Sequence, residues 1–158
     1  MTPPVEFCVM PVPSRSRGAA RMHGADDPYV EAVWLPVLGP ASFVLWRHLA
    51  RLTHRSPPPT VSVAGLSAAV GLGPPQAHQS PINRALRRLA RFGLVQVGAN
   101  GITVQAALPF VSGRQLARLD PAIQAMHRAY RDGVVRSASS SPASCADARG
   151  LEQVQGRS

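Results

Sequence analysis

The chain contains no lysine, and between Ala32 and Leu119 it contains no aspartate or glutamate. Nine of its 17 basic residues, all of them arginine, lie in that acid-free segment. The other eight arginines and all eight acids lie outside it and cancel, so the net charge of +9 belongs to the middle of the chain. Positive charge concentrated in this way is typical of a protein that neutralises phosphates.

A coding sequence rich in G and C offers another explanation, because it favours arginine over lysine. The same bias does not exclude the codons of aspartate and glutamate. The missing acids therefore favour nucleic-acid binding over mutational bias.

Cysteine is nearly absent, since only Cys8 and Cys145 occur and they lie far apart in the sequence. Two such residues form neither a zinc cluster nor a disulfide framework, which indicates a reducing, intracellular setting. The longest apolar stretches are broken by proline or glycine and are shorter than a membrane span, and no secretory signal is visible. We therefore expect a soluble cytoplasmic protein without a membrane partner.

Catalytic motifs are absent as well. General acid–base chemistry needs a positioned carboxylate or histidine with a partner, and the acid-free segment offers neither pairing. His48, His54 and His78 are scattered without the spacing of metal ligands. No P-loop, dinucleotide fingerprint or nucleophile elbow occurs. We expect no enzymatic activity, no cofactor, no metal and no small-molecule ligand.

Low-complexity composition marks both ends of the chain. Residues 1–27 and 133–158 are rich in serine, proline, glycine and alanine and lack apolar periodicity, which predicts two disordered tails. One domain remains, at residues 28–132.

Helical signals dominate the first half of this domain. A short helix is expected at 28–35, before Pro36, and a longer one at 40–54. In the longer helix, leucines and a tryptophan recur on one side and arginines at spacings of four on the other. After the prolines at 57–59 a short strand at 60–61 and a helix at 63–70, capped by Ser62, are expected.

A basic amphipathic helix is predicted at 81–92. Ser80 and Pro81 are a cap residue and a first-turn proline, and Gly93 ends the helix. Ile82, Leu86 and Leu89 form the apolar face, and the opposite face carries Arg84, Arg87, Arg88 and Arg91. Twelve residues span about 18 Å, enough to lie in the major groove of DNA.

From Leu94 the apolar period changes to two, which predicts a β-hairpin over 94–106. Asn100-Gly101 is a strong signal for a two-residue turn. Such a turn pairs Ala99 with Ile102 and Val97 with Val104, and places all apolar side chains on one face. The fold class is therefore α+β, mostly helical with a small hairpin.

Two further helices are expected at 113–119 and 121–131. In the second, an apolar stripe is formed by Ile123, Met126 and Tyr130. This stripe must pack somewhere. It could return to the first helix of the domain or meet its copy in a homodimer.

The segments VSVAGLSAAVGLG (61–73) and SPINRALRRLARFGLVQVGANGITV (80–104) resemble the winged helix-turn-helix family of actinobacterial and phage DNA-binding regulators. The pattern L-x-x-L-x-x-x-G-L-V, at the end of the basic helix, recurs in that family. More weakly, residues 34–52 look like the first helix of the winged-helix domain in the DnaD family of primosome proteins.

The resemblance implies a division of roles along the basic helix. Its amino-terminal half would enter the major groove, with Gln79, Asn83, Arg84 and Arg87 facing base edges. Arg88 and Arg91 would contact phosphate or the protein's own surface. Asn100, at the tip of the wing, would approach the minor groove or the backbone. Family members often carry a basic residue there, whereas this tip is neutral.

These features together predict sequence-specific binding of double-stranded DNA by a transcription regulator, dimeric through residues 121–131. The alternative is a winged-helix protein-interaction module in a replication, phage or sigma-factor assembly, in which the basic face meets an acidic partner. A third explanation is that the four arginines simply form a solvated helix face.

Overall fold

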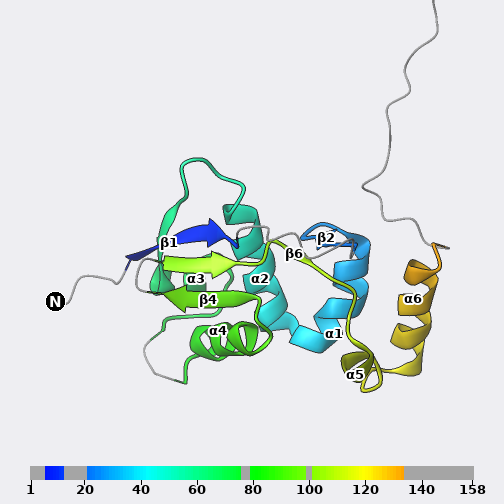
Figure 1. Cartoon of the computed structure of the whole chain (residues 1–158). Helices are drawn as coiled ribbons and strands as arrows, with labels where there is room; N and C mark the ends of the chain where they lie inside the picture. The colour runs from blue at the N-terminus through cyan, green and yellow to red at the C-terminus, as the bar shows by residue number, and fades with distance from the viewer. Residues whose placement is uncertain (1–5, 13–20, 76–78, 99–100, 134–158) are drawn as a thin grey trace, which may run out of the picture.

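The computed structural model describes residues 6–12, 21–75, 79–98 and 101–133 (Figure 1). Helices and a small mixed sheet form an α+β fold, as expected. Apart from Gly133, the expected tail at 133–158 lies outside the described residues.

The first helical segment runs from Pro28 to Leu38 without a break. A helical turn at Pro28 and Tyr29 continues into the π-helical η1 (Val30–Trp34) and then into α1 (Leu35–Leu38). The expected stop before Pro36 is wrong, because this proline lies in the first turn of α1. The segment ends at Gly39, whose φ of 75° reverses the chain direction.

The central helix is α2 (Pro40–Leu52), which begins at the expected residue and ends two residues early. Leu45, Trp46 and Leu49 are fully buried. The indole Nε1 of Trp46 donates a hydrogen bond to the carbonyl of Gln105 at 2.8 Å, so α2 is fixed directly to the chain that follows the hairpin.

The helices that follow also match the local signals. Strand β3 (Thr60–Ser62) leads into α3 (Val63–Ala69), where the Ser62 hydroxyl accepts the Gly65 N–H at 3.0 Å. Helix α4 (Pro81–Arg91) has Phe92 as its C-cap, and Gly93 follows with φ of 70°.

The sheet contains a strand that the sequence did not predict. Strand β1 (Glu6–Pro11) lies between β3 and β5 (Gly101–Val104), and β4 (Val95–Gly98) forms the other edge, so the strand order is β3-β1-β5-β4. Strand β1 runs antiparallel to β3 and parallel to β5. The prediction of a disordered tail over 1–27 is therefore wrong for residues 6–12 and 21–27. Val9 of the first segment is fully buried in the core, and His23 of the second is buried as well.

The register of the hairpin also differs from the prediction. Val97 pairs with Ile102 and Val95 with Val104, two residues away from the expected pairing. Gly101 is a strand residue paired with Cys8 and not part of the turn. A Cβ at Gly101 would meet the Cys8 carbonyl oxygen at 2.3 Å, so β1 can approach only because this residue is glycine. Residues 99 and 100, which join the strands, lie outside the described residues.

The remaining elements surround the first helical segment. Strand β2 (His23–Gly24) pairs with β6 (Ala107–Leu108), and α5 (Gly113–Leu116) and α6 (Pro121–Arg131) follow. Helix α6 packs against η1. Its apolar stripe thus returns to the first helical segment, which is one of the two expected outcomes.

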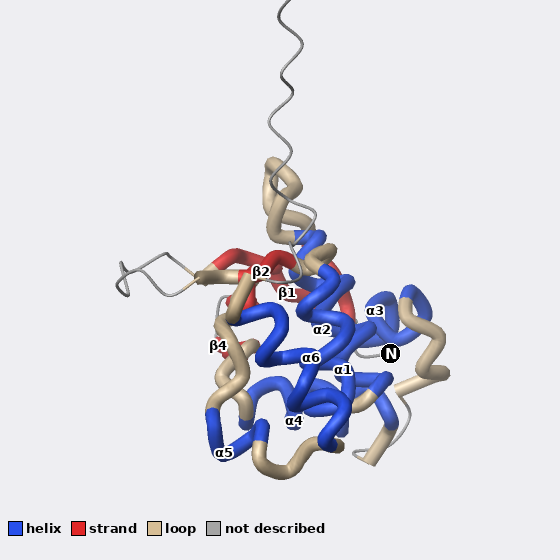
Figure 2. Tube along the Cα trace, turned by 90° about the vertical axis from the view of Figure 1, so that its right-hand side faces the viewer, coloured by secondary structure: helices blue, strands red, loops and turns tan. Residues whose placement is uncertain are grey.

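The core lies between the helices and one face of the sheet. Val9, Val95, Ile102 and Val104 from three strands are buried together with the apolar faces of α2 and α4. Figure 2 shows the helices gathered on one side of the strands. Consequently α4 has one face against the core and the opposite face exposed.

Candidate nucleic-acid interface

The outward face of α4 is built by helical periodicity. Ile82, Ala85 and Leu89 are buried against the core, which turns the other side of the helix toward solvent. Four arginines are exposed on that side, namely Arg84, Arg87, Arg88 and Arg91. The helix of 11 residues is about 16 Å long, which suits a major groove.

The amino-terminal end of α4 brings three predicted base-reading residues together. The Arg87 Nη2 atom lies 3.5 Å from Oε1 of Gln79, and its Nε lies 3.4 Å from the Asn83 carbonyl oxygen. Gln79 and Arg84 are exposed and Asn83 is half-buried. The structure thus brings Gln79, Asn83 and Arg87 together, and Arg84 lies exposed in the same half of the helix.

Arg88 has a different role from its neighbours. Its Nη2 atom donates a hydrogen bond of 2.9 Å to the carbonyl of Val37, near the carboxyl end of α1. Of the two expected partners, phosphate or the protein's own surface, the structure shows the second. Arg88 therefore links α4 to α1.

The arginines of α2 are neutralised by acids that precede the acid-free segment. Asp26 Oδ1 lies 2.5 Å from Arg51 Nη2 and 3.1 Å from Arg47 Nη2, and Glu31 lies 3.6 Å from Arg47. Hydrogen bonds from Arg51 and then Arg47 hold the pKa of Asp26 below its usual value. The two arginines also line a hollow of about 360 Å³ beside α3, but their charge is already matched.

Three arginines of α4 differ from those of α2 in this respect. Among the described residues, no carboxylate lies within ion-pair distance of Arg84, Arg88 or Arg91. The arginines of α2 are therefore neutralised, whereas Arg84, Arg88 and Arg91 leave positive charge on α4. Of these two helices, α4 has the electrostatic character that a polyanion would recognise.

The hairpin lies beside this helix. The ends of β4 and β5 that flank residues 99 and 100 are on the left in Figure 1, the same side as the amino-terminal end of α4. Val97 is 71% exposed and Gln96 is also exposed, so this strand end is not covered by the core. Asn100, the predicted wing-tip contact, lies outside the described residues.

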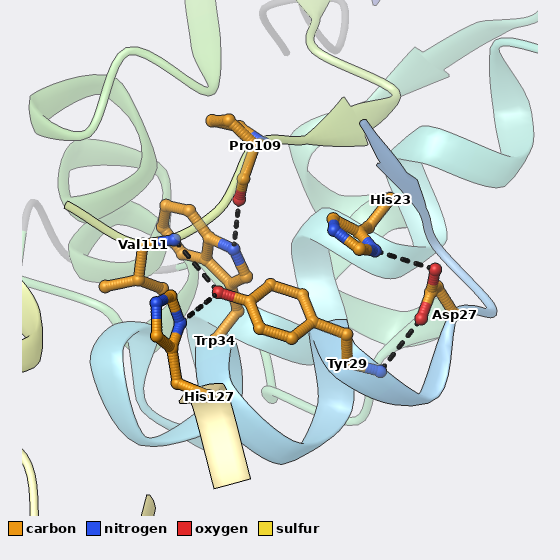
Figure 3. A network of polar contacts seen from close by, with 7 residues as sticks. All are labelled: His23, Asp27, Tyr29, Trp34, Pro109, Val111 and His127. Carbon is orange, nitrogen blue, oxygen red and sulfur yellow. Dashed lines mark hydrogen bonds and ion pairs between the residues drawn. The ribbon is translucent and has the colours of Figure 1, made fainter. Parts of the chain in front are cut away.

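A buried polar network was missed by the sequence predictions (Figure 3). The Tyr29 hydroxyl accepts the Val111 N–H at 2.9 Å and lies 2.9 Å from His127 Nδ1. Asp27 accepts the Tyr29 N–H at 2.9 Å and contacts His23 Nδ1 at 2.8 Å. Burial raises the pKa of Tyr29 to about 12 and lowers that of His127, so both side chains are neutral near pH 7.

Part of this network could have been found from the sequence. Asp27-Pro28 is a cap residue followed by a first-turn proline, the same signal that predicted the helix at Asp120-Pro121. The contacts of Tyr29 with residues 111 and 127 have no local signal, because their partners lie far along the chain.

The part of the chain that the structure describes contains no group of three or more histidine, cysteine or acidic residues that could hold a metal ion. Within the same ranges, no helix has the length and apolar character needed to cross a membrane.

Comparison with known proteins finds no match to this chain among family models, curated proteins or solved structures. The family resemblance therefore stays a prediction, and a function has to be inferred from the residues and their geometry.

Proposed function

We propose that this protein binds double-stranded DNA, with α4 in the major groove and the β4–β5 hairpin beside it, as in a winged helix-turn-helix protein. The order of α2, β3, α3, α4 and the hairpin supports this assignment. Residues 70–80, which join α3 to α4, form a longer connection than the roughly three or four residues of an ordinary helix-turn-helix. Contacts with α2 and the Arg88–Val37 bond hold α4 instead.

The observation that carries the proposal is the difference in charge between two basic helices. Asp26 and Glu31 match the arginines of α2, whereas the described residues provide no carboxylate partner for Arg84 or Arg91 on α4. If the arginines of α4 only formed a solvated helix face, there would be no reason for one basic helix to have acidic partners and the other to lack them. Duplex DNA supplies closely spaced negative charges that an uncompensated, exposed row of arginines can neutralise.

Sequence would be read at the amino-terminal half of α4. Arginine is suited to guanine and glutamine or asparagine to adenine. Arg84 and Arg87 are the proposed guanine readers, and Gln79 and Asn83 the proposed adenine readers. Arg91 would contact phosphate, and the hairpin end near Val97 would lie along the backbone. A protein with this arrangement would act as a transcription regulator.

A homodimer through residues 121–131 has less apolar surface available than the sequence suggested. Tyr130 and His127 pack within the chain and Ile123 is half-buried. Met126, 43% exposed, is the large apolar side chain of α6 that stays at the surface. We keep the dimer as a proposal for a DNA-bound state, in which two half-sites would bring two copies together.

The test begins with selection of binding sites from a pool of random duplexes by the full chain, followed by sequencing. Arg84→Ala and Arg87→Ala are then compared on the selected duplex and on a random one. Each should weaken selected-site binding by about 5- to 150-fold, and random-duplex binding by much less. Arg128→Ala, an exposed arginine on α6, is the matched control and should leave both affinities unchanged on duplexes that hold a single half-site, where no second copy is bound.

Two results would contradict this function. No binding to any duplex at about 50 mM salt would remove DNA as the partner. Equal losses on selected and random duplexes would remove the base-reading role of Arg84 and Arg87. Capture of an acidic protein by a chain that does not bind DNA would favour the protein-interaction module.

A further inference from the structure

A second exposed pair of arginines lies in α5 and directly after it. Arg114 is in α5, and Arg118 follows it by four residues. Both are exposed, whereas Leu116 and Leu119 between and beside them pack against the core. The two arginines are therefore directed outward by the burial of their neighbours.

The segment that carries these arginines has a defined conformation. Gln115 Oε1 accepts hydrogen bonds from the Ser112 N–H at 3.1 Å and the Ser112 hydroxyl at 2.8 Å. Helical hydrogen bonds then continue beyond α5, from Ala117 N to Gly113 O and from Arg118 N to Gln115 O. Arg114 and Arg118 thus lie on neighbouring turns of one short helical stretch.

The helical segment 28–38 connects this stretch to α4. On one side, Arg88 of α4 donates to the Val37 carbonyl at 2.9 Å. On the other, Trp34 Nε1 donates to the Pro109 carbonyl at 3.0 Å, and Val111 N donates to the Tyr29 hydroxyl at 2.9 Å. In Figures 1 and 2, α4, α1 and α5 all lie below the sheet, at one end of the molecule. The two arginine-bearing elements are therefore both tied to the helical segment 28–38 at one end of the molecule.

The charges near α5 leave this pair largely uncompensated. No carboxylate of the described residues lies within ion-pair distance of Arg114 or Arg118. Asp120 is the acid that is close in sequence, and its Oδ1 accepts the Ala122 N–H at 2.8 Å as the cap of α6. Exposed positive charge is therefore present on α5 and the residues after it as well as on α4.

We infer that Arg114 and Arg118 form a second phosphate-binding site, which contacts the backbone of the duplex beyond the carboxyl end of α4. This inference rests on the proposed DNA binding and extends its footprint. Phosphate contacts fix the orientation of a protein on DNA but carry no sequence information. The site would thus raise affinity for every duplex equally and hold α4 in register.

The salt dependence of binding tests the inference, because each phosphate contact contributes about 0.9 to the slope of log affinity against log salt. The full chain is titrated with a labelled random duplex between about 50 and 200 mM salt. Arg114→Gln with Arg118→Gln should lower the slope by about 1 to 2, and leave the ratio of selected to random affinity unchanged.

A matched control separates a local contact from a general loss of charge. Arg128→Gln with Arg131→Gln removes the same charge from the carboxyl-terminal turn of α6, which lies away from α4 and α5 in Figure 1. On a duplex that holds a single half-site, where no second copy is bound, this variant should keep the wild-type slope. Asp120→Asn keeps a good cap residue but removes a negative charge near Arg118, and should raise affinity for any duplex.

The outcomes distinguish the two proposals. A wild-type chain that does not bind duplex DNA contradicts DNA binding itself, and the second site with it. If the wild type binds, but the Arg114/Arg118 variant keeps the slope of the α6 control and Asp120→Asn has no effect, only the second site is overturned. Circular dichroism and urea unfolding of each variant exclude loss of folding as the cause of weaker binding.

Discussion

The Tyr29 hydroxyl and Nδ1 of His127 lie 2.9 Å apart, although the two residues are 98 positions apart in the sequence. The same hydroxyl oxygen accepts the Val111 N–H, and its own proton is available for a hydrogen bond to His127. Burial favours the neutral imidazole of His127, and Nδ1 accepts the Tyr29 proton when the ring proton is on Nε2. One hydroxyl group thus joins the first helical segment, the chain before α5, and α6.

Tyr29→Phe should therefore lower stability without changing the DNA surface. It removes the acceptor of the buried Val111 N–H and the hydrogen-bond partner of His127 Nδ1, which we expect to cost about 1–3 kcal/mol. Urea unfolding measures the change, with DNA affinity determined under native conditions. Tyr130→Phe is the control, since Tyr130 is also buried but its hydroxyl makes no hydrogen bond within the described residues. An equal loss of unfolding free energy in this variant would show that the hydrogen bonds of Tyr29 do not stabilise the fold.

Stability should fall as the pH is lowered below about 6.5, the ordinary pKa of histidine. Burial, and then Arg131 and Arg128, lower the pKa of His127 in the folded chain. Below about 6.5 the unfolded chain therefore binds a proton that the folded chain does not, until the pH reaches the folded pKa. Urea unfolding at about pH 7.5 and about pH 5 measures this difference. Protonated His127 could no longer accept from Tyr29.

His48 has to be separated from this effect. Burial, followed by Arg55 and Arg51, lowers its pKa in the same direction. His127→Gln and His48→Gln should each remove part of the pH dependence above the range in which Asp26 titrates. An unchanged pH profile in His127→Gln would show that the imidazole is not held neutral by its surroundings.

Arg88 and Arg91 should give opposite results although both are exposed on α4. Arg88→Ala removes the bond to the Val37 carbonyl and should lower stability by about 1 kcal/mol, with little effect on DNA affinity beyond that of one lost charge. Arg91→Ala should change stability by less than about 0.5 kcal/mol but reduce the salt slope of DNA binding. Thermal unfolding and DNA titration of both variants measure these effects. A larger loss of stability in Arg91→Ala, or a larger change of the salt slope in Arg88→Ala, would contradict the two roles.

Gly101→Ala should be strongly destabilising, by about 3 kcal/mol or more. The new Cβ would lie 2.3 Å from the Cys8 carbonyl oxygen, at a φ of 144° that residues with side chains rarely adopt. Gly98→Ala, directly opposite on β4, would meet its nearest atom at 3.8 Å and should be tolerated. Equal unfolding midpoints for the two variants would contradict the position of β1 beside β5.

Much of the helical structure could be predicted because its signals are local. Ser62 and Asp120 accept backbone N–H groups as cap residues, as their positions indicated. Helix α6 has the predicted bounds, and α4 ends one residue early. Caps, first-turn prolines and helical spacing depend on residues within a few positions of one another, and a single sequence contains them in full.

The errors arose where distant segments meet. The apolar residues 7–10 lie among prolines, and their partners in β3 and β5 are far along the chain, so no local signal predicts a strand there. Asn100-Gly101 predicts a turn from local signals alone, whereas the structure needs glycine at 101 for the close approach of β1.

The candidate site shows the same limit. Exposure of the arginines on α4 followed from periodicity, whereas neutralisation of Arg47 and Arg51 by Asp26 depends on how the preceding chain folds back. Charge counted along the sequence could not distinguish the two helices. The role of Arg88 likewise depends on the position of Val37, which periodicity does not give.

The place of β1 also constrains how the chain folds during synthesis. Its neighbours on either side, β3 and β5, are translated much later, and Cys8 pairs with both Thr60 and Gly101. Contacts between such distant residues form slowly, because a long loop must close before they stabilise it. We therefore expect α2, α3 and α4 to assemble first on the ribosome, and the first strand to join the sheet only after residue 104 has emerged.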